Sequence, residues 1–154
     1  MAYLVDTNVM WRRFHAADPA YPTVKQEIDK LLLVGENVCI TAQNLIEFQS
    51  LATRPVGANG LGYSVSEASR MADEMVDMFS FLPDTPAIYR HWRQLINRYD
   101  VKGRQVHDAR LVAVMLTYRI ANLLTLNGTH FHRFEEITVI EPTPHARKIE
   151  FDSQ

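Results

Sequence analysis

Short apolar runs alternate along the chain with longer segments in which apolar residues recur at helical spacing. The runs cover residues 3–5, 38–40, 79–82, 123–126 and 137–140. Runs of this length predict short buried strands, and the spaced segments predict amphipathic helices. Both signals continue to residue 140 without repeats or low-complexity tracts.

The spaced segments predict helices over residues 8–17, 23–34, 42–53, 64–79, 85–99 and 106–120. Several of their ends carry recognisable signals. Gly35 can end the second helix, Thr41 can cap the third, and Ser64 with Glu67 forms a capping box for the fourth. Pro86 stands where the first residue of the fifth helix is expected.

This alternation predicts an α/β fold, in which helices cover both faces of a central, mostly parallel sheet of four to five short strands. At 154 residues, the chain has the length of one domain. In sheets of this kind the ligand site lies beyond the carboxyl ends of the strands. Candidate functional residues are therefore those that follow a strand or open the next helix.

Composition and charge are those of an ordinary globular protein, with 47% hydrophobic residues, a net charge of −2 and a pI near 6.3. This balance gives no long-range attraction for nucleic acid, so such a contact needs a local patch. The apolar start is interrupted by Asp6, and no run approaches the roughly 20 apolar residues of a membrane span. With Cys39 as the single cysteine, we expect a cytoplasmic protein without a membrane segment.

Three acids occupy candidate positions: Asp6 follows the first strand, and Glu47 and Asp108 lie on helices. Each has a purely structural interpretation. Asp6 could be a helix N-cap, although Thr7 or Asn8 could fill that role. Glu47 could be a solvated helix acid, but no basic residue stands three or four positions away to pair with it.

Asp108 heads the apolar stripe formed by Leu111, Val112 and Met115. Its structural interpretation is a first-turn acid that favours the helix dipole, paired with Arg104 one turn earlier. An isolated acid on an apolar stripe is costly to bury unless a cation meets it. Three carboxylates at one edge of a sheet repel one another, and a hard divalent cation such as Mg²⁺ or Mn²⁺ removes that conflict.

The ordered motifs of this chain resemble those of the PIN-domain ribonucleases, and most of all the VapC-type toxins of bacterial type II toxin–antitoxin pairs. The resemblance runs from Ala2 to about Pro142. The matching segments are Leu4-Val5-Asp6-Thr7-Asn8, Thr41-Ala42-Gln43-Asn44-Leu45-Ile46-Glu47-Phe48, His107-Asp108-Ala109-Arg110-Leu111, and Leu123-Leu124-Thr125-Leu126-Asn127-Gly128-Thr129-His130-Phe131.

The resemblance implies a Rossmann-like, three-layer PIN domain over residues 1–142, followed by a polar tail over residues 143–154. It implies an endoribonuclease that depends on Mg²⁺ or Mn²⁺, with Asp6, Glu47 and Asp108 as catalytic residues and metal ligands. Asn127 stands where the family often has a fourth acid. An amide oxygen can still bind a cation, but it brings no charge.

Three further residues are candidates for substrate contact: Asn8, Arg104 and Thr125. Arg104 could bind an RNA phosphate, or it could belong to a solvated connector. Thr125 could orient a water or a phosphate, or it could be a strand residue. The resemblance further implies a cognate antitoxin partner and a homodimer.

Two other functions stay open at this stage. A phosphohydrolase of the haloacid-dehalogenase type also uses an early Asp at a strand end, but it needs a second Asp two residues on, where this chain has Asn8. The replacement of an acid by Asn127 motivates a different alternative: a PIN-like module with weakened catalysis that binds RNA or protein.

Overall fold

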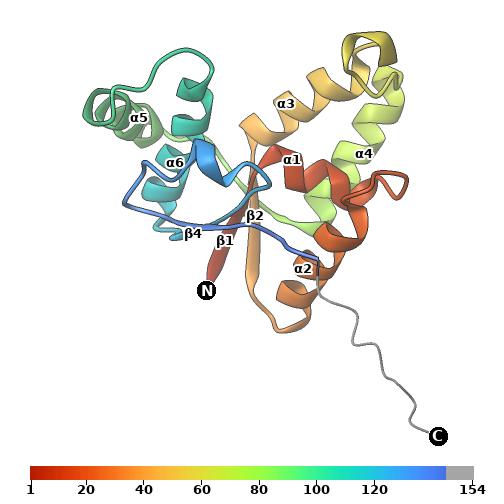
Figure 1. Cartoon of the computed structure of the whole chain (residues 1–154), viewed down its shortest axis with the longest axis horizontal. Helices are drawn as coiled ribbons and strands as arrows, with labels where there is room; N and C mark the ends of the chain where they lie inside the picture. The colour runs from red at the N-terminus through yellow and green to blue at the C-terminus, as the bar shows by residue number, and fades with distance from the viewer. Residues whose placement is uncertain (145–154) are drawn as a thin grey trace, which may run out of the picture.

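The central feature is a five-stranded sheet in the order β3-β2-β1-β4-β5, in which all neighbouring strands are parallel. The computed structural model describes residues 1–144 of the chain. The strands are β1 (Ala2–Val5), β2 (Asn37–Thr41), β3 (Ser80–Leu82), β4 (Asn122–Leu124) and β5 (Thr138–Ile140). The predicted parallel sheet is confirmed, and β1 lies at its centre (Figure 1).

Six α-helices within residues 1–144 cover the two faces of the sheet, with three short 3₁₀ helices beside them. The α-helices are α1 (Thr7–Met10), α2 (Tyr21–Leu33), α3 (Ala42–Thr53), α4 (Val65–Met78), α5 (Pro86–Arg98) and α6 (Gln105–Tyr118). The 3₁₀ helices are η1 (Trp11–Phe14), η2 (Val56–Ala58) and η3 (Gly128–His130).

The predicted helix starts are confirmed where the capping signals were clearest. Thr41 and Asn44 exchange side-chain and backbone hydrogen bonds in a capping box at the start of α3. Ser64 and Glu67 do the same at the start of α4. These boxes satisfy N–H groups that a helix leaves without intrahelical partners.

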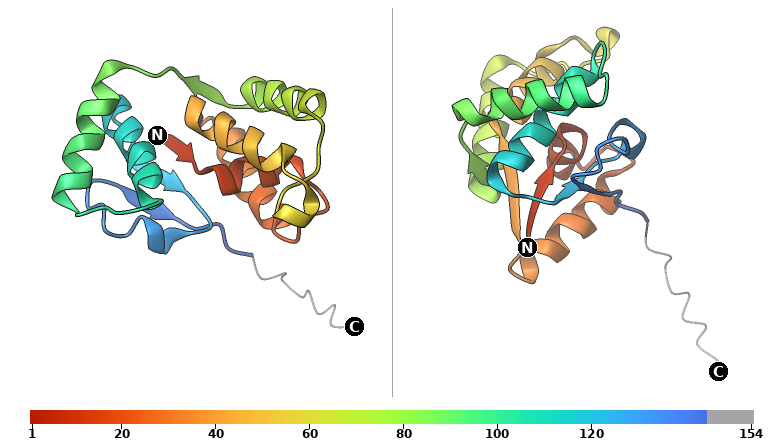
Figure 2. Two further views of the ribbon diagram at one scale, coloured as in Figure 1. Left: turned by 90° about the horizontal axis from the view of Figure 1, so that it is seen from above. Right: turned by 90° about the vertical axis from the view of Figure 1, so that its left-hand side faces the viewer.

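Alternation along the strands divides the buried residues into two cores. Tyr3 and Val5 of β1 face a core shared with α1 to α4, whereas Leu4 faces a second core built largely by α5 and α6. Figure 2 shows α5 and α6 on one side of the sheet and α3 and α4 on the other. This is the three-layer arrangement predicted from the alternating pattern.

The first predicted helix is too long. The α-helix ends at Met10 and continues only as η1, to Phe14. Further along, the Oδ1 of Asp18 accepts the backbone N–H of Ala20 just before α2. The same oxygen accepts a hydrogen bond from the guanidinium of Arg12. Helix α2 then begins at Tyr21, two residues before the predicted start.

The fourth strand is shorter than predicted and ends at Leu124 instead of Leu126. The backbone N–H of Leu126 donates to the Oδ1 of Asn8 at 3.2 Å, so the chain leaves the sheet and is held by a side chain. Thr125 therefore lies just past the carboxyl end of β4. This position brings it to the edge of the sheet at which the ligand site was expected.

None of the helices in residues 1–144 is long and apolar enough to cross a membrane. Cys39 is fully buried, as expected of a core residue. Of the predicted polar tail, residues 145–154 lie outside the described part of the chain.

Candidate functional site

Asp6 lies at the carboxyl end of the central strand and is 7% exposed. Its Oδ1 accepts the backbone N–H of Thr7 at 2.7 Å, so Asp6 is the N-cap of α1. The suggestion that Thr7 or Asn8 could take the capping role is therefore wrong. Capping uses one carboxylate oxygen, and the other oxygen faces a different partner.

The second oxygen of Asp6 joins β1 to the end of β4. The hydroxyl of Thr125 donates to Oδ2 of Asp6 at 2.9 Å and accepts the backbone N–H of Asn127 at 3.0 Å. The backbone N–H of Asp6 donates to the carbonyl of Leu124 at 2.8 Å. The connections from β1 and β4 leave in opposite directions across the sheet, so this contact lies at the topological switch point, where α/β sheets bind ligands.

Glu47 reaches the same edge from the second turn of α3. Its Oε2 accepts a hydrogen bond of 2.6 Å from the hydroxyl of Thr7, which neighbours Asp6. Its Oε1 accepts a hydrogen bond of 2.8 Å from Nε2 of Gln43, one turn earlier on α3. Asn44 donates to the hydroxyl of Thr7 at 3.0 Å and to the carbonyl of Val5 at 3.2 Å. Glu47 is therefore a fixed carboxylate, and its structural interpretation as a freely solvated acid is wrong.

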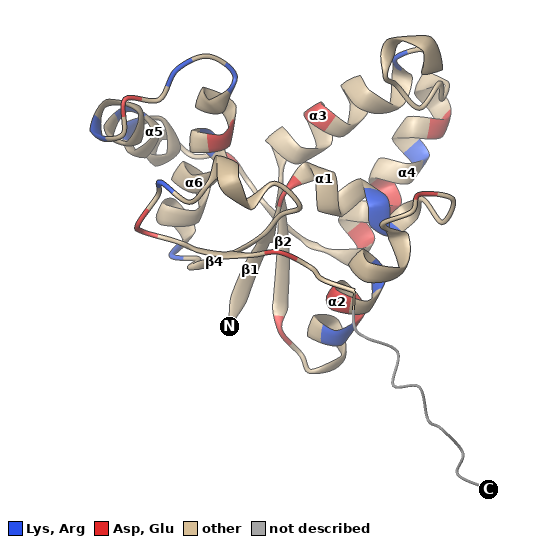
Figure 3. Ribbon diagram, in the orientation of Figure 1, with Lys and Arg blue, Asp and Glu red and all other residues tan. Residues whose placement is uncertain are grey.

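Asp108 approaches from the first turn of α6, as predicted. Its side chain is 24% exposed, and its Oδ2 lies 3.5 Å from Nδ1 of His130 in η3. The structural interpretation of Asp108 paired it with Arg104, whereas the side chain found beside it is His130. The two acids on helices thus flank Asp6 from α3 and α6, and Figure 3 shows acidic positions at the β1–α1 junction and on α3.

Burial and mutual repulsion change the acidity of this group. The pKa of Asp6 is raised from 3.8 to about 6, chiefly by burial and further by the charges of Asp108 and Glu47, while the hydrogen bonds from Thr125 and Thr7 lower it. Burial also raises the pKa of Asp108, with a further contribution from Glu47, whereas His130 lowers it. Carboxylates that raise one another's pKa are typical of sites that bind a cation or move a proton.

The donor set suits a hard divalent cation, since it consists of carboxylate and amide oxygens without thiolates. Within residues 1–144, no group of three or more His, Cys, Asp or Glu side chains is placed so that it could hold a metal ion. Mg²⁺ keeps several waters and binds through as few as one or two carboxylates. Asp6, Glu47 and Asp108 are the carboxylates at this edge that could supply one or two such ligands.

The other predicted site residues occupy different surroundings. Asn8 is half-buried, and its Oδ1 holds the backbone N–H of Leu126. Asn127 is exposed just after Thr125, near the same edge. Arg104 is exposed and lines a hollow of about 490 Å³ together with Glu47, Arg54 and His107. Thr125 contacts Asp6 directly, so a role as an ordinary strand residue is wrong.

Sequence reasoning did not assign Thr7, Gln43 or His130 a contact with the three acids. Gln43 carried a readable signal, because residues four apart share a helix face and a glutamine can donate to a carboxylate there. Thr7 and His130 carried no comparable signal. Thr7 meets Glu47 across 40 positions of the chain, and His130 meets Asp108 only through the fold.

Solved structures of toxin–antitoxin proteins share this fold. A chain of VapBC2 from Rickettsia felis, solved bound to a DNA fragment of the promoter, matches with a TM-score of 0.68 and 14% identity, over 92% of this chain and 98% of that one. A chain of VapBC-1 from nontypeable Haemophilus influenzae matches with a TM-score of 0.69 and 17% identity, over 94% and 100%.

VapC20 from Mycobacterium tuberculosis, described as a toxin that cleaves the sarcin–ricin loop, matches with a TM-score of 0.61 and 20% identity, over 83% of this chain and 92% of that one. At these identities the likeness concerns the fold. Sequence comparison with curated proteins gives no significant match. The model of the PIN domain family matches residues 3–137, which is most of the chain, and this protein therefore belongs to the PIN domain family.

Proposed function

We propose that this protein is an endoribonuclease that depends on Mg²⁺ or Mn²⁺ and is the toxin of a toxin–antitoxin pair. One observation carries the proposal: three acids from β1, α3 and α6 interact electrostatically at the switch point of the sheet, and burial and repulsion raise the pKa of two of them. Asp6, Glu47 and Asp108 would hold the cation. Asn127 would add a neutral oxygen beside them.

When bound, the cation would neutralise charge at the scissile phosphate and make a water more acidic. The chain's own residues prepare for this by fixing the acids before any ligand arrives. Thr125 and the backbone of Thr7 orient the two oxygens of Asp6, and Gln43 with the Thr7 hydroxyl orients those of Glu47. Such outer partners typically change metal affinity or activity 10- to 100-fold when they are removed.

Contacts to the RNA strand would come from the rim of the site. Arg104 and Arg54 line the hollow beside Glu47, where a guanidinium could pair with a phosphate through two hydrogen bonds. Asn8 and Thr125 lie between the acids and the β4 exit, where they would order the phosphate or its water. Arg54 and Arg104 would form the local basic patch that a chain of net charge −2 needs in order to bind RNA.

The proposed partners follow from the relatives. A structural neighbour from Klebsiella pneumoniae is named as a toxin–antitoxin complex, and VapC20 is named as a toxin that cleaves the sarcin–ricin loop. We accordingly propose an antitoxin partner, an RNA substrate in the cytoplasm, and a homodimer as the functional unit. The PIN domain would comprise residues 1–142, with residues 143–154 as a separate polar tail.

The test is RNA cleavage by the purified full chain with Mn²⁺ and with a chelator. Asp6→Asn and Asp108→Asn should reduce cleavage at least about 100-fold, because each removes a charged metal ligand. Asp6→Asn is well matched, since Asn is as good an N-cap as Asp, and circular dichroism would verify its fold. Cleavage by both folded variants at the parent rate would overturn the proposal.

The exposed Asn127 favours a second candidate, a PIN-like module that binds RNA or protein but cleaves poorly. The same assay separates the two functions. RNA binding by the parent without Mn²⁺-dependent cleavage would support the binding module. A phosphohydrolase of the haloacid-dehalogenase type would need a second acid at position 8. This chain has Asn8 there, and its side chain accepts the backbone N–H of Leu126.

A further inference from the structure

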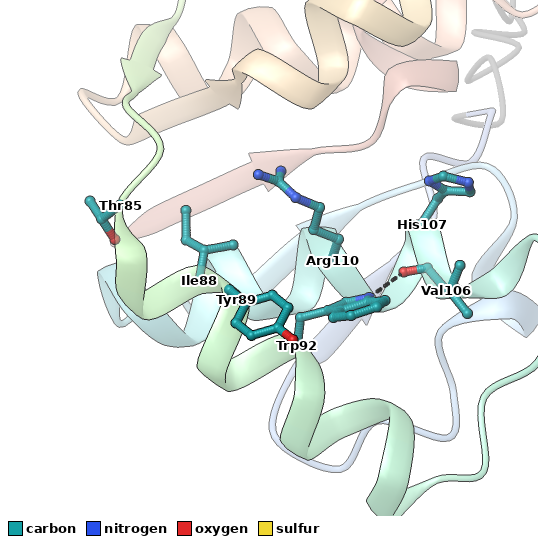
Figure 4. A pocket seen from close by; sticks show the side chains of 7 residues that line it. All are labelled: Thr85, Ile88, Tyr89, Trp92, Val106, His107 and Arg110. Atoms are coloured by element: carbon teal, nitrogen blue, oxygen red, sulfur yellow. Dashed lines mark hydrogen bonds between the residues drawn. The ribbon is translucent and has the colours of Figure 1, made fainter.

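An aromatic hollow of about 350 Å³ opens between α5 and α6 (Figure 4). Its floor and walls include Ile88, Tyr89 and Trp92 from α5, and His107 and Arg110 from α6. Tyr89 is 61% exposed at the surface. We refer to this space as the aromatic hollow.

One ring of the aromatic wall is held by a hydrogen bond, and the other packs beside it. Nε1 of Trp92 donates to the carbonyl of Val106 at 2.8 Å, which locks the orientation of the indole. The ring of Tyr89 lies beside it, with 6.0 Å between the ring centroids and an angle of 35° between the planes. A fixed aromatic surface next to solvent is the kind of platform on which unpaired nucleic-acid bases stack.

Arg110 supplies the polar side of the hollow. Its Nη1 donates to Oε1 of Gln43 at 3.2 Å, and its Nη2 lies 3.3 Å from Oδ1 of Asp84. These two contacts use two of the five N–H donors of a guanidinium. The side chain is thus held at the rim by Gln43 and Asp84, with donors to spare for the oxygen and nitrogen acceptors of a base edge.

Gln43 connects this hollow to the acids. The side-chain Oε1 of Gln43 accepts a hydrogen bond from Arg110. Its Nε2 donates to Oε1 of Glu47 at 2.8 Å and to the carbonyl of His107 at 2.7 Å. His107 also lines two neighbouring hollows that reach Glu47, one of about 370 Å³ and one of about 490 Å³. The last of these ends at Arg54 and Arg104, and Figure 3 shows basic positions in the segment between α5 and α6.

We propose that the aromatic hollow is a nucleobase subsite, which takes one unpaired base of a single-stranded RNA whose neighbouring phosphate lies at the acids. The base would stack on Tyr89 and accept hydrogen bonds from Arg110, while Arg104 and Arg54 hold phosphates on the other side of Glu47. The identity of the strand as a substrate rests on the proposed function, but binding of the base does not require cleavage.

The charges favour RNA over a protein in this place. Three arginines line the aromatic hollow and the hollow beside Glu47, namely Arg110, Arg54 and Arg104. A polyanion with exposed bases matches both these cations and the aromatic wall. The competing occupant of the aromatic hollow is a second copy of this chain, which would bury Tyr89. It predicts an effect of Tyr89 on oligomeric state and none on the affinity of one chain for RNA.

The experiment measures binding of a fluorescein-labelled single-stranded oligoribonucleotide by anisotropy, with the full chain carrying Asp6→Asn so that the probe stays intact. On this background Tyr89→Ala should weaken binding by about 5- to 100-fold, the loss expected for one stacked base. Tyr89→Phe should restore affinity to within about twofold, because stacking needs the ring and not the hydroxyl. Added oligonucleotide should also quench the fluorescence of Trp92 in the background protein, and Tyr89→Ala should reduce that quenching.

Leu33→Ala is the matched control. Leu33 is 88% exposed at the end of α2, and α2 leads into the amino end of β2, on the edge of the sheet opposite the acids. This variant should bind the probe like the background protein. Equal probe affinity for Tyr89→Ala and Leu33→Ala would overturn the subsite, and so would a change confined to sedimentation and oligomeric state.

These outcomes are separable from the proposed function. A parent protein that cleaves RNA in Mn²⁺ but shows no dependence of probe binding on Tyr89 would keep the nuclease and remove the subsite. A parent protein that never cleaves RNA, while probe binding and Trp92 quenching depend on Tyr89, would keep the subsite and remove the nuclease.

Discussion

The hydroxyl of Thr125 donates a hydrogen bond of 2.9 Å to Oδ2 of Asp6, although 119 positions of the chain separate the two residues. The contact joins the ends of β1 and β4 at the switch point of the sheet. It also lowers the pKa of an aspartate that burial and two neighbouring acids push upward. Thr125 thus keeps Asp6 oriented and easier to ionise.

Replacement of Thr125 by Val should separate these contributions, because the two side chains have nearly the same shape. The variant loses the bond to Asp6 and leaves the backbone N–H of Asn127 without its acceptor, so we expect unfolding to become easier by about 1–3 kcal/mol. The acidic limb of the pH–cleavage profile should move to higher pH, because the pKa of Asp6 rises further. Thr125→Ser, which keeps the hydroxyl, should retain the parent profile. An unchanged limb in the Val variant would contradict this role.

Asp6 should make stability depend on pH in metal-free buffer. Below pH 3.8 the carboxyl is protonated in the folded and unfolded chains alike, so it imposes no penalty. As pH rises to about 6, the unfolded chain ionises while the folded chain keeps its proton, so the contribution of Asp6 to the free energy of unfolding falls. Above pH 6, the shift of this pKa from 3.8 to about 6 lowers the free energy of unfolding by about 3 kcal/mol.

Asp6→Asn removes that ionisation and keeps the cap. Urea unfolding at pH 5 and pH 7.5 in a chelator should therefore show the variant gaining on the parent as pH rises. A stability difference between the two proteins that is the same at both pH values would argue against a raised pKa for Asp6.

Gln43 offers a test of positioning, because its amide holds Oε1 of Glu47 from one turn away. Gln43→Leu should lower Mn²⁺ affinity or the cleavage rate by about 10- to 100-fold while the protein stays folded. Gln49→Leu, on the same helix α3, provides a matched glutamine replacement and should behave like the parent. Comparable losses in both variants would mean that α3 tolerates neither change and that Gln43 has no special part.

Asn127→Asp tests the neutral position beside the acids. Asn127 is exposed, so an added carboxylate pays little for desolvation, and a further charged oxygen should tighten Mn²⁺ binding. We expect a gain of about 3- to 10-fold in affinity, measured by calorimetry. Unchanged Mn²⁺ affinity in this variant would show that residue 127 lies outside the metal's surroundings.

Most of the fold could be predicted from the sequence, because the signals that mark its elements are local. Thr41 and Ser64 mark helix starts through contacts with residues three positions away, and Pro86 marks one through its fixed backbone angle. All three helices begin where these signals predict. The end of the fourth strand was misplaced because the side chain of Asn8 holds Leu126 away from the sheet. The first helix was also predicted too long, since its α-helical part ends at Met10 and its 3₁₀ part at Phe14.

The residues of the candidate site likewise differ in whether a local pattern indicates them. The three acids could be predicted, because each stands at a strand end or on a helix that leaves the sheet. Their partners could not, with the exception of Gln43, because Thr125 and His130 reach Asp6 and Asp108 only once the sheet has formed. The raised pKa of Asp6 depends on that assembled burial, so no local pattern could have indicated it.

Calorimetric titration with Mn²⁺ tests the central claim most directly, because it asks whether Asp6, Glu47 and Asp108 form one cation site. The parent chain should bind Mn²⁺, and Asp6→Asn, Glu47→Gln and Asp108→Asn should each weaken that binding at least about 10-fold while retaining the folded circular dichroism spectrum. Parent-like Mn²⁺ affinity in all three folded variants would contradict the account.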